Sequence, residues 1–259
     1  MEIFLQADTW GALVTLTFLE IVLGIDNIIF ISIAASKLPE NQQKKATNIG
    51  LFLAMVLRIA LLFGISLLIA MNAPLFHVNW SWFEGGFTGQ ALILFAGGIF
   101  LLYKATKEIH HKVEGGFDEG INEETKKKKH TLSQAILQIT LINIVFSFDS
   151  ILTAVGMTNG VEGAMIIMIV SVVLSMIIMM LFANPVGKFV NKHPTIQMLG
   201  LSFLILIGFM LIAESAHLSH AKLFGETIGA IPKGYLYFAI TFSLVVEMLN
   251  MKMRSNKKK

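Results

Sequence analysis

Two related stretches of sequence decide the fold of this chain. They are Glu20-Ile21-Val22-Leu23-Gly24-Ile25-Asp26-Asn27-Ile28 and, 123 residues later, Asn143-Ile144-Val145-Phe146-Ser147-Phe148-Asp149-Ser150-Ile151. Each stretch places acidic or amide side chains inside an apolar segment that is long enough to cross a bilayer. An ionisable side chain at that depth costs about 2.5–3.5 kcal/mol on insertion scales, so these stretches indicate a functional site within a membrane.

The composition indicates a membrane protein. Hydrophobic residues make up 55% of the 259 residues and charged residues make up 14%, whereas a soluble domain carries about 25% charged residues. We therefore expect an all-α membrane protein, with Pro74 and Pro185 just after the ends of its second and fifth spans. Seven stretches have the length of a spanning helix: 10–33, 50–71, 88–106, 133–156, 163–183, 197–214 and 233–251.

The basic residues predict the orientation of these spans. With the N-terminus outside, seventeen of the 20 lysine and arginine residues are cytoplasmic, and only Lys222 and Lys233 lie outside. Because cytoplasmic loops carry the excess of positive charge, we expect an N-out, C-in topology. The one sizeable soluble segment is the cytoplasmic loop 107–132. Its closing run of lysines is interpreted as a topology anchor, with a lipid-binding or regulatory patch as the alternative.

The second stretch opens the second half of the chain, which indicates an internal repeat. Asn72-Ala73-Pro74 resembles Asn184-Pro185, and Gly98-Ile99-Phe100-Leu101-Leu102 resembles Gly208-Phe209-Met210-Leu211-Ile212. Spans one to three then correspond to spans four to six with opposite orientation, as in many secondary transporters. We expect one polytopic domain, 1–259. It comprises repeat one (1–106), the charged loop (107–132), repeat two (133–214), and an outer loop, extra seventh span and basic tail (215–259).

Helical spacing gathers the polar side chains of each stretch on one face. Carboxylate, amide and hydroxyl oxygens suit divalent cations such as Mn²⁺, Mg²⁺ or Ca²⁺, and the absence of cysteine excludes thiolate sites. Gly24 and Ser147, in the middle of the two faces, would permit close helix approach or a local helix break toward a cavity. The alternative to an ion site is a buried hydrogen-bond network that only joins helices. The predicted metal ligands are Glu20, Asp26, Asn27, Asn143, Asp149 and Ser150.

Three further residues are second-tier candidates for the pathway or for charge balance: Arg58, Ser147 and Glu247. Arg58 lies inside the second span, where it either extends to the membrane interface or balances the carboxylates. The three carboxylates of the predicted ligand set and Arg58 together carry a formal charge of −2, so one divalent cation or two protons would neutralise the site. We therefore hypothesise that metal transport is coupled to proton exchange.

Other functional classes have little support in the sequence. It contains no Gly-rich phosphate loop or nucleotide domain, so an enzyme or an ATP-driven pump is not expected. The basic residues lie between apolar runs, which argues against nucleic-acid binding, and no resident cofactor is expected. The expected partners are a divalent ion and the bilayer, with a homo-oligomer or a secretion-machinery partner left open. His110, His111, His217 and His220 are expected to be solvated, with metal loading at the entrance as the alternative, and Glu214 is a weaker candidate than Glu247.

Several motifs resemble the TerC family of integral membrane proteins, over essentially the whole chain. They are the two opening stretches, Lys104-Ala105-Thr106-Lys107-Glu108-Ile109-His110, Ile231-Pro232-Lys233-Gly234-Tyr235 and Val246-Glu247-Met248-Leu249-Asn250. The family is named for tellurium resistance, and the resemblance implies manganese export or metal supply to exported proteins. It also implies that Glu20, Asp26, Asn27, Asp149 and Ser150 are the motif residues. The outer loop from His217 to Glu226 is longer than the resemblance leads us to expect.

We therefore expect a multi-pass protein of a bacterial cell (plasma or inner) membrane that exports a divalent cation, with Mn²⁺ chosen on the resemblance. A membrane scaffold in metal, tellurite or envelope stress and a passive divalent-cation channel are the alternatives. If both stretches were straight helices with Glu20 and Asn143 at mid-membrane, Asp26 and Asp149 would each lie about 9 Å away, in opposite directions. Either the helices break or tilt, or the two aspartates serve opposite gates.

Overall fold

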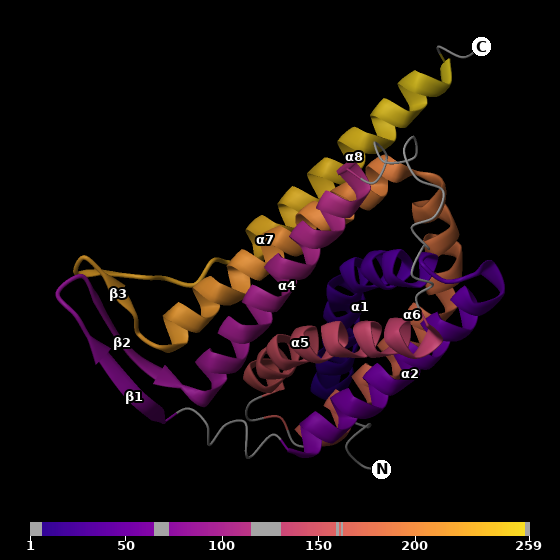
Figure 1. Cartoon of the computed structure of the whole chain (residues 1–259). Coiled ribbons are helices and arrows are strands. Elements are labelled where there is room, and N and C mark those ends of the chain that lie inside the picture. The colour runs from indigo at the N-terminus through magenta and orange to yellow at the C-terminus, as the bar shows by residue number, and fades with distance from the viewer. Residues whose placement is uncertain (1–6, 65–72, 115–130, 159–160, 162, 257–259) are drawn as a thin grey trace. The chain divides into compact units, whose positions relative to one another are not determined.

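Seven long helices form most of the described part of the protein (Figure 1). The computed structural model of the chain describes residues 7–64, 73–114, 131–158, 161 and 163–256. Within these residues, seven helices are long and apolar enough to cross a membrane, which confirms the predicted helical membrane class and the number of spans. The helices are α1 (Ala7–Ser36), α2 (Glu40–Phe63), α4 (Gly89–Glu114), α5 (Leu132–Thr158), α6 (Ala164–Lys192), α7 (Pro194–Leu218) and α8 (Lys233–Asn256).

The helices extend beyond the apolar windows that the sequence shows. α2 begins at Glu40 rather than at residue 50, and α4 continues to Glu114 rather than ending at residue 106. Backbone hydrogen bonding does not stop where the hydrocarbon ends, so polar residues in the interface continue a helix. The first residues of the predicted loop 107–132 are therefore helical. The predicted end of the second span and the lysine run fall in 65–72 and 115–130, outside the described residues.

The predicted end of the fifth span is wrong. The sequence predicts that Pro185 follows the end of the fifth span, but α6 continues through Pro185 to Lys192. Proline removes one backbone donor, yet membrane helices tolerate it because neighbouring helices satisfy the freed groups. Packing supports this part of α6, since a Cβ on Gly187 would lie 2.9 Å from Oγ of Ser32 on α1. Pro74, the predicted counterpart of Pro185, begins a strand instead.

A small antiparallel sheet is added to the predicted helices. It contains, in spatial order, β1 (Pro74–Asn79), β2 (Phe83–Thr88), β3 (Lys222–Leu223) and β4 (Glu226–Thr227). Phe224 and Gly225, between β3 and β4, have φ values of 52° and 85°, the left-handed pair that a two-residue hairpin of this type requires. This hairpin pairs with β2 and accounts for the unexpected length of the outer loop.

Contacts between elements divide the chain into two compact units. Unit 1 comprises Met1–Ile69 and Glu124–Lys192, and unit 2 comprises Ala70–Glu123 and His193–Lys259. In unit 1, α1 packs mainly on α6 and α2 on α5, while in unit 2, α4 packs along α7 and α8 adjoins α7. Each of the three main pairs joins one helix from each predicted repeat, which is the pattern that a two-fold relation would produce. The inverted repeat, the membrane orientation and the domain divisions stay predictions.

Glycines permit close helix approach in both units. In unit 2, a Cβ on Gly98 would lie 2.7 Å from the carbonyl oxygen of Gly208, and one on Gly208 would lie 3.0 Å from the carbonyl oxygen of Gly98. This contact is reciprocal, and these glycines are counterparts in the predicted repeat. In unit 1, Met179 of α6 covers Gly24 of α1. Gly24 therefore serves close approach, and the alternative of a local helix break is wrong because α1 and α5 are continuous.

Candidate functional site

A buried ion pair and a hydrogen bond, both made by one arginine, connect three helices of unit 1. Arg58 of α2 donates from Nη1 to a carboxylate oxygen of Glu20 on α1, and from Nη2 to Oγ of Ser150 on α5. Glu20 is 5% exposed, Arg58 is 4% exposed and Ser150 is 3% exposed. A charge removed from water is tolerated when it is paired and hydrogen-bonded, and this arrangement supplies both. We call these three residues the Arg58 cluster.

The cluster distinguishes the two interpretations of Arg58. An arginine that extends to the interface keeps its guanidinium in water, whereas the side chain of Arg58 is almost fully buried against Glu20. Arg58 is therefore the counter-charge of Glu20. The pair is formally neutral, so the negative charge that remains in the predicted ligand set belongs to Asp26 and Asp149.

Asn27 presents a buried oxygen that lacks a hydrogen-bond partner. The residue is 5% exposed, and no described group donates to its Oδ1. It lies two turns from Glu20 on the same face of α1. An unsatisfied buried acceptor costs about 1–3 kcal/mol, and a cation would satisfy it because amide carbonyls are ordinary ligands of hard divalent ions. Asn48 and Glu247 also keep a buried oxygen without a partner among the described groups, so Asn27 is a candidate ligand because it also belongs to the first polar stretch.

The polar side chains of α5 use their donor groups within their own helix. The amide nitrogen of Asn143 donates to the carbonyl oxygen of Ile139 at 2.9 Å. Ser147 donates to the carbonyl oxygen of Asn143 at 2.5 Å, and Ser150 donates to that of Ser147 at 3.1 Å. With these donors engaged, the side-chain oxygens of Asn143 and Ser147 remain as acceptors, which is the chemistry of a cation site, while the oxygen of Ser150 accepts from Arg58. The same bonds also occur in a network that only stabilises helices, the alternative weighed from the sequence.

Asp26 and Asp149 occupy the predicted places along the backbone. Asp26 precedes Asn27 in α1, and Asp149 precedes Ser150 in α5, but the side chains of both aspartates lie outside the described part of the structure. Among the side chains that are described, no group of three or more His, Asp and Glu residues is placed to hold a metal. The predicted ligand set therefore stays a prediction, with the Arg58 cluster and Asn27 as its described members.

The cluster corrects the expected depth of the two aspartates. One guanidinium contacts both Glu20 and Ser150, so these side chains lie at the same level, whereas the straight-helix estimate places Glu20 level with Asn143. Counted from this level, Asp149 is one residue away along α5 and Asp26 is six residues away along α1, or about 9 Å. For straight antiparallel helices, this would reduce the axial separation of the two aspartates to roughly half of the earlier estimate.

Glu247, the other second-tier acid, belongs to unit 2. It accepts a hydrogen bond from Asn250 at 3.5 Å and one from Thr195 of α7. Glu247 and Thr195 border a cavity of about 560 Å³ between α7 and α8. Glu247 and the Arg58 cluster therefore lie in different units, and the described contacts of Glu247 are those of a helix–helix interface.

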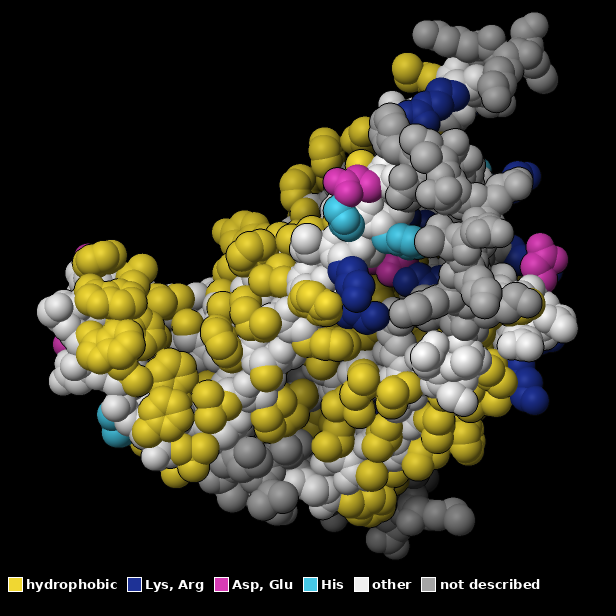
Figure 2. Space-filling model, viewed as in Figure 1, with side chains coloured by type: hydrophobic (Ala, Val, Ile, Leu, Met, Phe, Trp, Pro, Cys, Tyr) yellow, Lys and Arg dark blue, Asp and Glu magenta, His cyan; other side chains and the backbone are white. Residues whose placement is uncertain are grey.

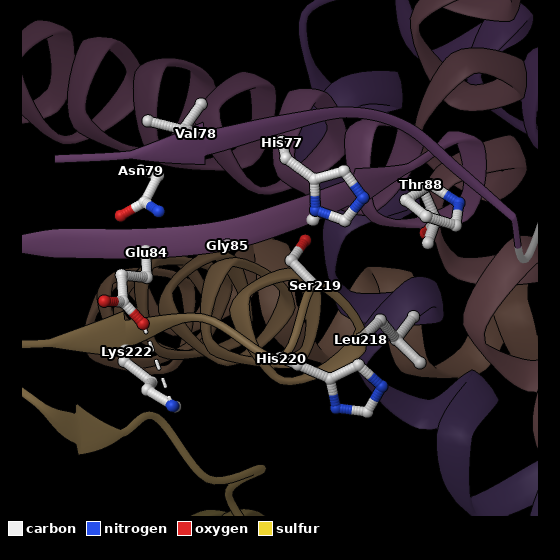
Figure 3. Close-up of a pocket in the computed structure, with 12 residues that line it drawn as sticks. His77, Val78, Asn79, Glu84, Gly85, Thr88, Leu218, Ser219, His220 and Lys222 are labelled. Carbon is white, nitrogen blue, oxygen red and sulfur yellow. Dashed lines mark ion pairs between the residues drawn. The ribbon is translucent and has the colours of Figure 1, made fainter.

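A second cavity, of about 570 Å³, lies against the sheet in unit 2 (Figure 3). His77 and Glu84 of the β1–β2 hairpin line it, together with His220 and Lys222 after α7. Glu84 and Lys222 form an ion pair at 3.7 Å. The alternative that outer histidines load a metal finds no three-ligand group among the described residues. The four predicted solvated histidines are exposed: His110, His111, His217 and His220.

The comparison with known proteins now identifies the family. A family model described as "Integral membrane protein TerC family" matches residues 5–259. The chain belongs to the TerC family. This membership covers both polar stretches, the Arg58 cluster and the whole of the sheet, and it confirms the family that the sequence motifs indicate.

Curated relatives of this TerC-family chain are bacterial. It is 45% identical over 244 residues to the UPF0053 inner membrane protein YgdQ of Escherichia coli (strain K12), covering 94% of this chain and 93% of the relative. It is 42% identical over 247 residues to a UPF0053 protein of Haemophilus influenzae, covering 95% of each. It is also 42% identical to the UPF0053 inner membrane protein YoaE of Escherichia coli, but spans only 45% of that relative. No solved structure matches the chain. These findings confirm a bacterial integral membrane protein.

Arg58 is the site residue that sequence reasoning ranked too low. It stands at the centre of the described contacts, because its two donors join α1, α2 and α5. A signal was present in the sequence, since Arg58 lies well inside a predicted span whereas Lys104 and Lys233 lie at the ends of theirs. Its partner could not be chosen from that signal, because spacing along the chain does not show which acid lies beside which span.

Proposed function

We propose that this TerC-family protein is a secondary transporter that exports a divalent cation, with Mn²⁺ as the substrate, in exchange for protons. The observation that carries the proposal is the buried Arg58 cluster together with the unpartnered carbonyl oxygen of Asn27. Several described side chains keep a buried polar atom without a partner, and Asn27 is the one among them that belongs to the predicted ligand set. A cation pathway supplies the missing partner when the substrate is bound.

Charge balance supports a divalent substrate. Because Arg58 neutralises Glu20, the remaining formal charge of the predicted site is the −2 of Asp26 and Asp149. One divalent cation would neutralise this charge, and so would two protons. If the site is neutral with either occupant, its exposure can change from one membrane face to the other at low electrostatic cost. An empty site with two buried charges would make this change costly. This is the physical basis of an exchange mechanism.

The choice of Mn²⁺ rests on oxygen chemistry and on the family resemblance. Carboxylate and amide oxygens suit Mg²⁺, Ca²⁺ and Mn²⁺ alike, and the chain has no cysteine that would favour softer ions. The resemblance to the TerC family, with its associated manganese export, favours Mn²⁺ among them. We expect no enzymatic activity and no resident cofactor.

The test is Mn²⁺ flux in vesicles that contain the purified protein. We expect Asp26→Asn and Asp149→Asn to abolish flux, because each removes one of the two unbalanced charges. Glu114→Gln is the matched control, since the Glu114 side chain is 67% exposed and its ion pair among the described residues is with His110. An imposed pH gradient should accelerate wild-type flux and leave the two inactive variants unchanged.

Three outcomes would contradict the proposal in different ways. Equal flux in wild type and both aspartate variants would remove the site assignment. Absence of flux in folded wild-type protein would favour a membrane scaffold. Fast conduction that ignores the pH gradient would favour a passive channel.

A further inference from the structure

The sheet of unit 2 has two chemically different faces. In the β1–β2 register, Phe76 lies opposite Phe87 and Val78 opposite Gly85, while His77 lies opposite Gly86. Because alternate residues of a strand point to opposite faces, the aromatic residues gather on one side. We call this side the aromatic face; its members are Phe76, Phe83, Phe87 and Leu223, with Trp80 and Trp82 at the hairpin end.

Ring contacts make the aromatic face continuous. Phe76 stacks on Phe87 with ring centroids 5.1 Å apart, and Phe83 lies 6.1 Å from Phe87. Trp82 lies 5.9 Å from Phe83 and 5.5 Å from Trp80. These aromatic side chains therefore form one row along the hairpin and not a set of separate surface residues.

The opposite face of the sheet is polar. His77, Asn79, Glu84 and Lys222 border the cavity shown in Figure 3, where Glu84 points toward Lys222. The ring of His77 lies across Gly86, because a Cβ at that glycine would be 2.9 Å from two of the imidazole atoms. The β1–β2 hairpin is thus amphipathic, whereas at the β3–β4 edge the exposed Glu226 pairs with Leu223 and puts one charged side chain on the aromatic side.

The aromatic row is unusually open. Trp80 is 59% exposed, Trp82 is 46% exposed and Phe76 is 47% exposed, although they contact one another. Phe224, at the tip of the β3–β4 hairpin, is 77% exposed. A contiguous apolar patch of this kind marks a surface that contacts a membrane or another protein.

Position and composition favour the membrane. The hairpin continues directly into α4, and β3 follows the end of α7, so the sheet is attached where two spanning helices reach one membrane surface. Figure 1 shows the sheet running sideways from these helix ends and not onward along their axes. In Figure 2, hydrophobic side chains gather over this sheet. Between residues 73 and 88 the only acidic or basic side chain besides His77 is Glu84, on the polar face.

We propose that this sheet is an interfacial anchor whose aromatic face lies in the headgroup region of the bilayer. Tryptophan prefers this region, because its ring is apolar while its indole N–H needs a polar partner. The polar face then remains toward water, and the anchor holds the outer ends of α4 and α7 at a fixed depth. A protein partner on the same face is the outcome that the experiment must separate.

The experiment compares two adjacent positions of β1 that lie on opposite faces. The three native tryptophans are replaced by phenylalanine, and a single tryptophan is then introduced by Phe76→Trp or by His77→Trp. Each variant is reconstituted in phosphatidylethanolamine–phosphatidylglycerol vesicles. Its fluorescence is measured with phospholipids brominated near the headgroup, and separately with aqueous iodide. Far-UV circular dichroism verifies that both variants are folded.

We expect brominated lipid to cause the larger loss of emission in the Phe76→Trp variant and iodide to cause the larger loss in the His77→Trp variant. The emission of the Phe76→Trp variant should also shift to shorter wavelength. The proposal is overturned if both variants are quenched by iodide alone, because the aromatic face would then lie in water and await a protein partner. It is also overturned if brominated lipid quenches both equally, since the sheet would then have no preferred face. Neither result bears on Mn²⁺ flux, so the anchor and the transport function are tested separately.

Discussion

Removing one member of the buried ion pair is expected to destabilise the protein more than removing both. The variants are Arg58→Met, Glu20→Gln and the double substitution of both residues. In Arg58→Met, the carboxylate of Glu20 keeps a residue exposure of only 5% but loses its cation. In Glu20→Gln, the guanidinium loses its anion but keeps Ser150 as an acceptor. In the double variant no charge of the pair remains buried.

The size of the effect follows from the burial of the pair. Two unit charges about 4 Å apart attract by about 4 kcal/mol at an effective dielectric of about 20. Removing one partner of a buried pair costs about 3–5 kcal/mol, whereas replacing both by uncharged residues of similar volume is often neutral. In a chain of this size, 1 kcal/mol shifts Tm by about 2–4 °C. Each single variant should therefore unfold about 6–20 °C below wild type, and the double variant within a few degrees of it.

The assay is thermal unfolding in one detergent, followed by Mn²⁺ flux in vesicles. Arg254→Met is the control, because Arg254 is an exposed cation near the end of α8 and surface substitutions change stability by only about 0.5 kcal/mol. The electrostatic argument fails if either single variant has the same Tm as wild type. It also fails if the Tm of the double variant is as low as that of the less stable single variant. Mn²⁺ flux through the double variant then separates two roles of Glu20. If a stable double variant transports Mn²⁺, Glu20 acts only as the charge partner of Arg58. If it is stable but does not transport, Glu20 belongs to the ion pathway.

Three further predictions concern single positions. Asn27→Leu should leave Tm unchanged or raise it, because it replaces an unsatisfied buried oxygen by an apolar group of similar shape. Mn²⁺ flux should fall in the same variant, and intact flux would show that Asn27 is not a ligand. Gly98→Ala should destabilise the protein by about 1–3 kcal/mol through overpacking, because its Cβ would meet the carbonyl oxygen of Gly208 at 2.7 Å. Gly156→Ala, with nothing within 4 Å, is the control, and equal melting of these two variants would contradict the close helix contact. His220→Gly should raise Tm by about 2–4 °C, because His220 follows the C-cap Ser219 of α7 with φ 47°, where glycine is free of the Cβ penalty. A lower Tm would show that the imidazole contributes more stability than the backbone gains.

The span pattern was readable from the sequence because hydropathy is a local property. A stretch of about 20 apolar residues crosses a bilayer whatever its neighbours are, and seven such stretches became seven helices. The ends were harder to predict. Pro185 indicates a helix end by its own chemistry, but α6 continues because Gly187 packs against Ser32 of another helix.

The sheet escaped prediction for a related reason. Its strands are six residues or shorter, and an apolar window of span length does not resolve them. β3 pairs with β2 across more than 130 residues of sequence, and β4 pairs with β3. The β3–β4 hairpin is too short to be recognised from its own sequence without that distant partner strand. The left-handed Phe224-Gly225 turn could have indicated the second hairpin, since glycine after a short apolar segment is a turn signal.

The sequence by itself determined that acids and amides lie within membrane-spanning helices, because polarity inside an apolar segment needs no tertiary information to be recognised. It also determined that one arginine accompanies them. Only the tertiary structure decided which acid that arginine neutralises, because Glu20 lies 38 residues from Arg58 and Ser150 lies 92 residues from it. In a medium of low dielectric, a buried charge is stabilised by the group that packs beside it, and that neighbour is set by how the helices pack and not by the order of residues along the chain.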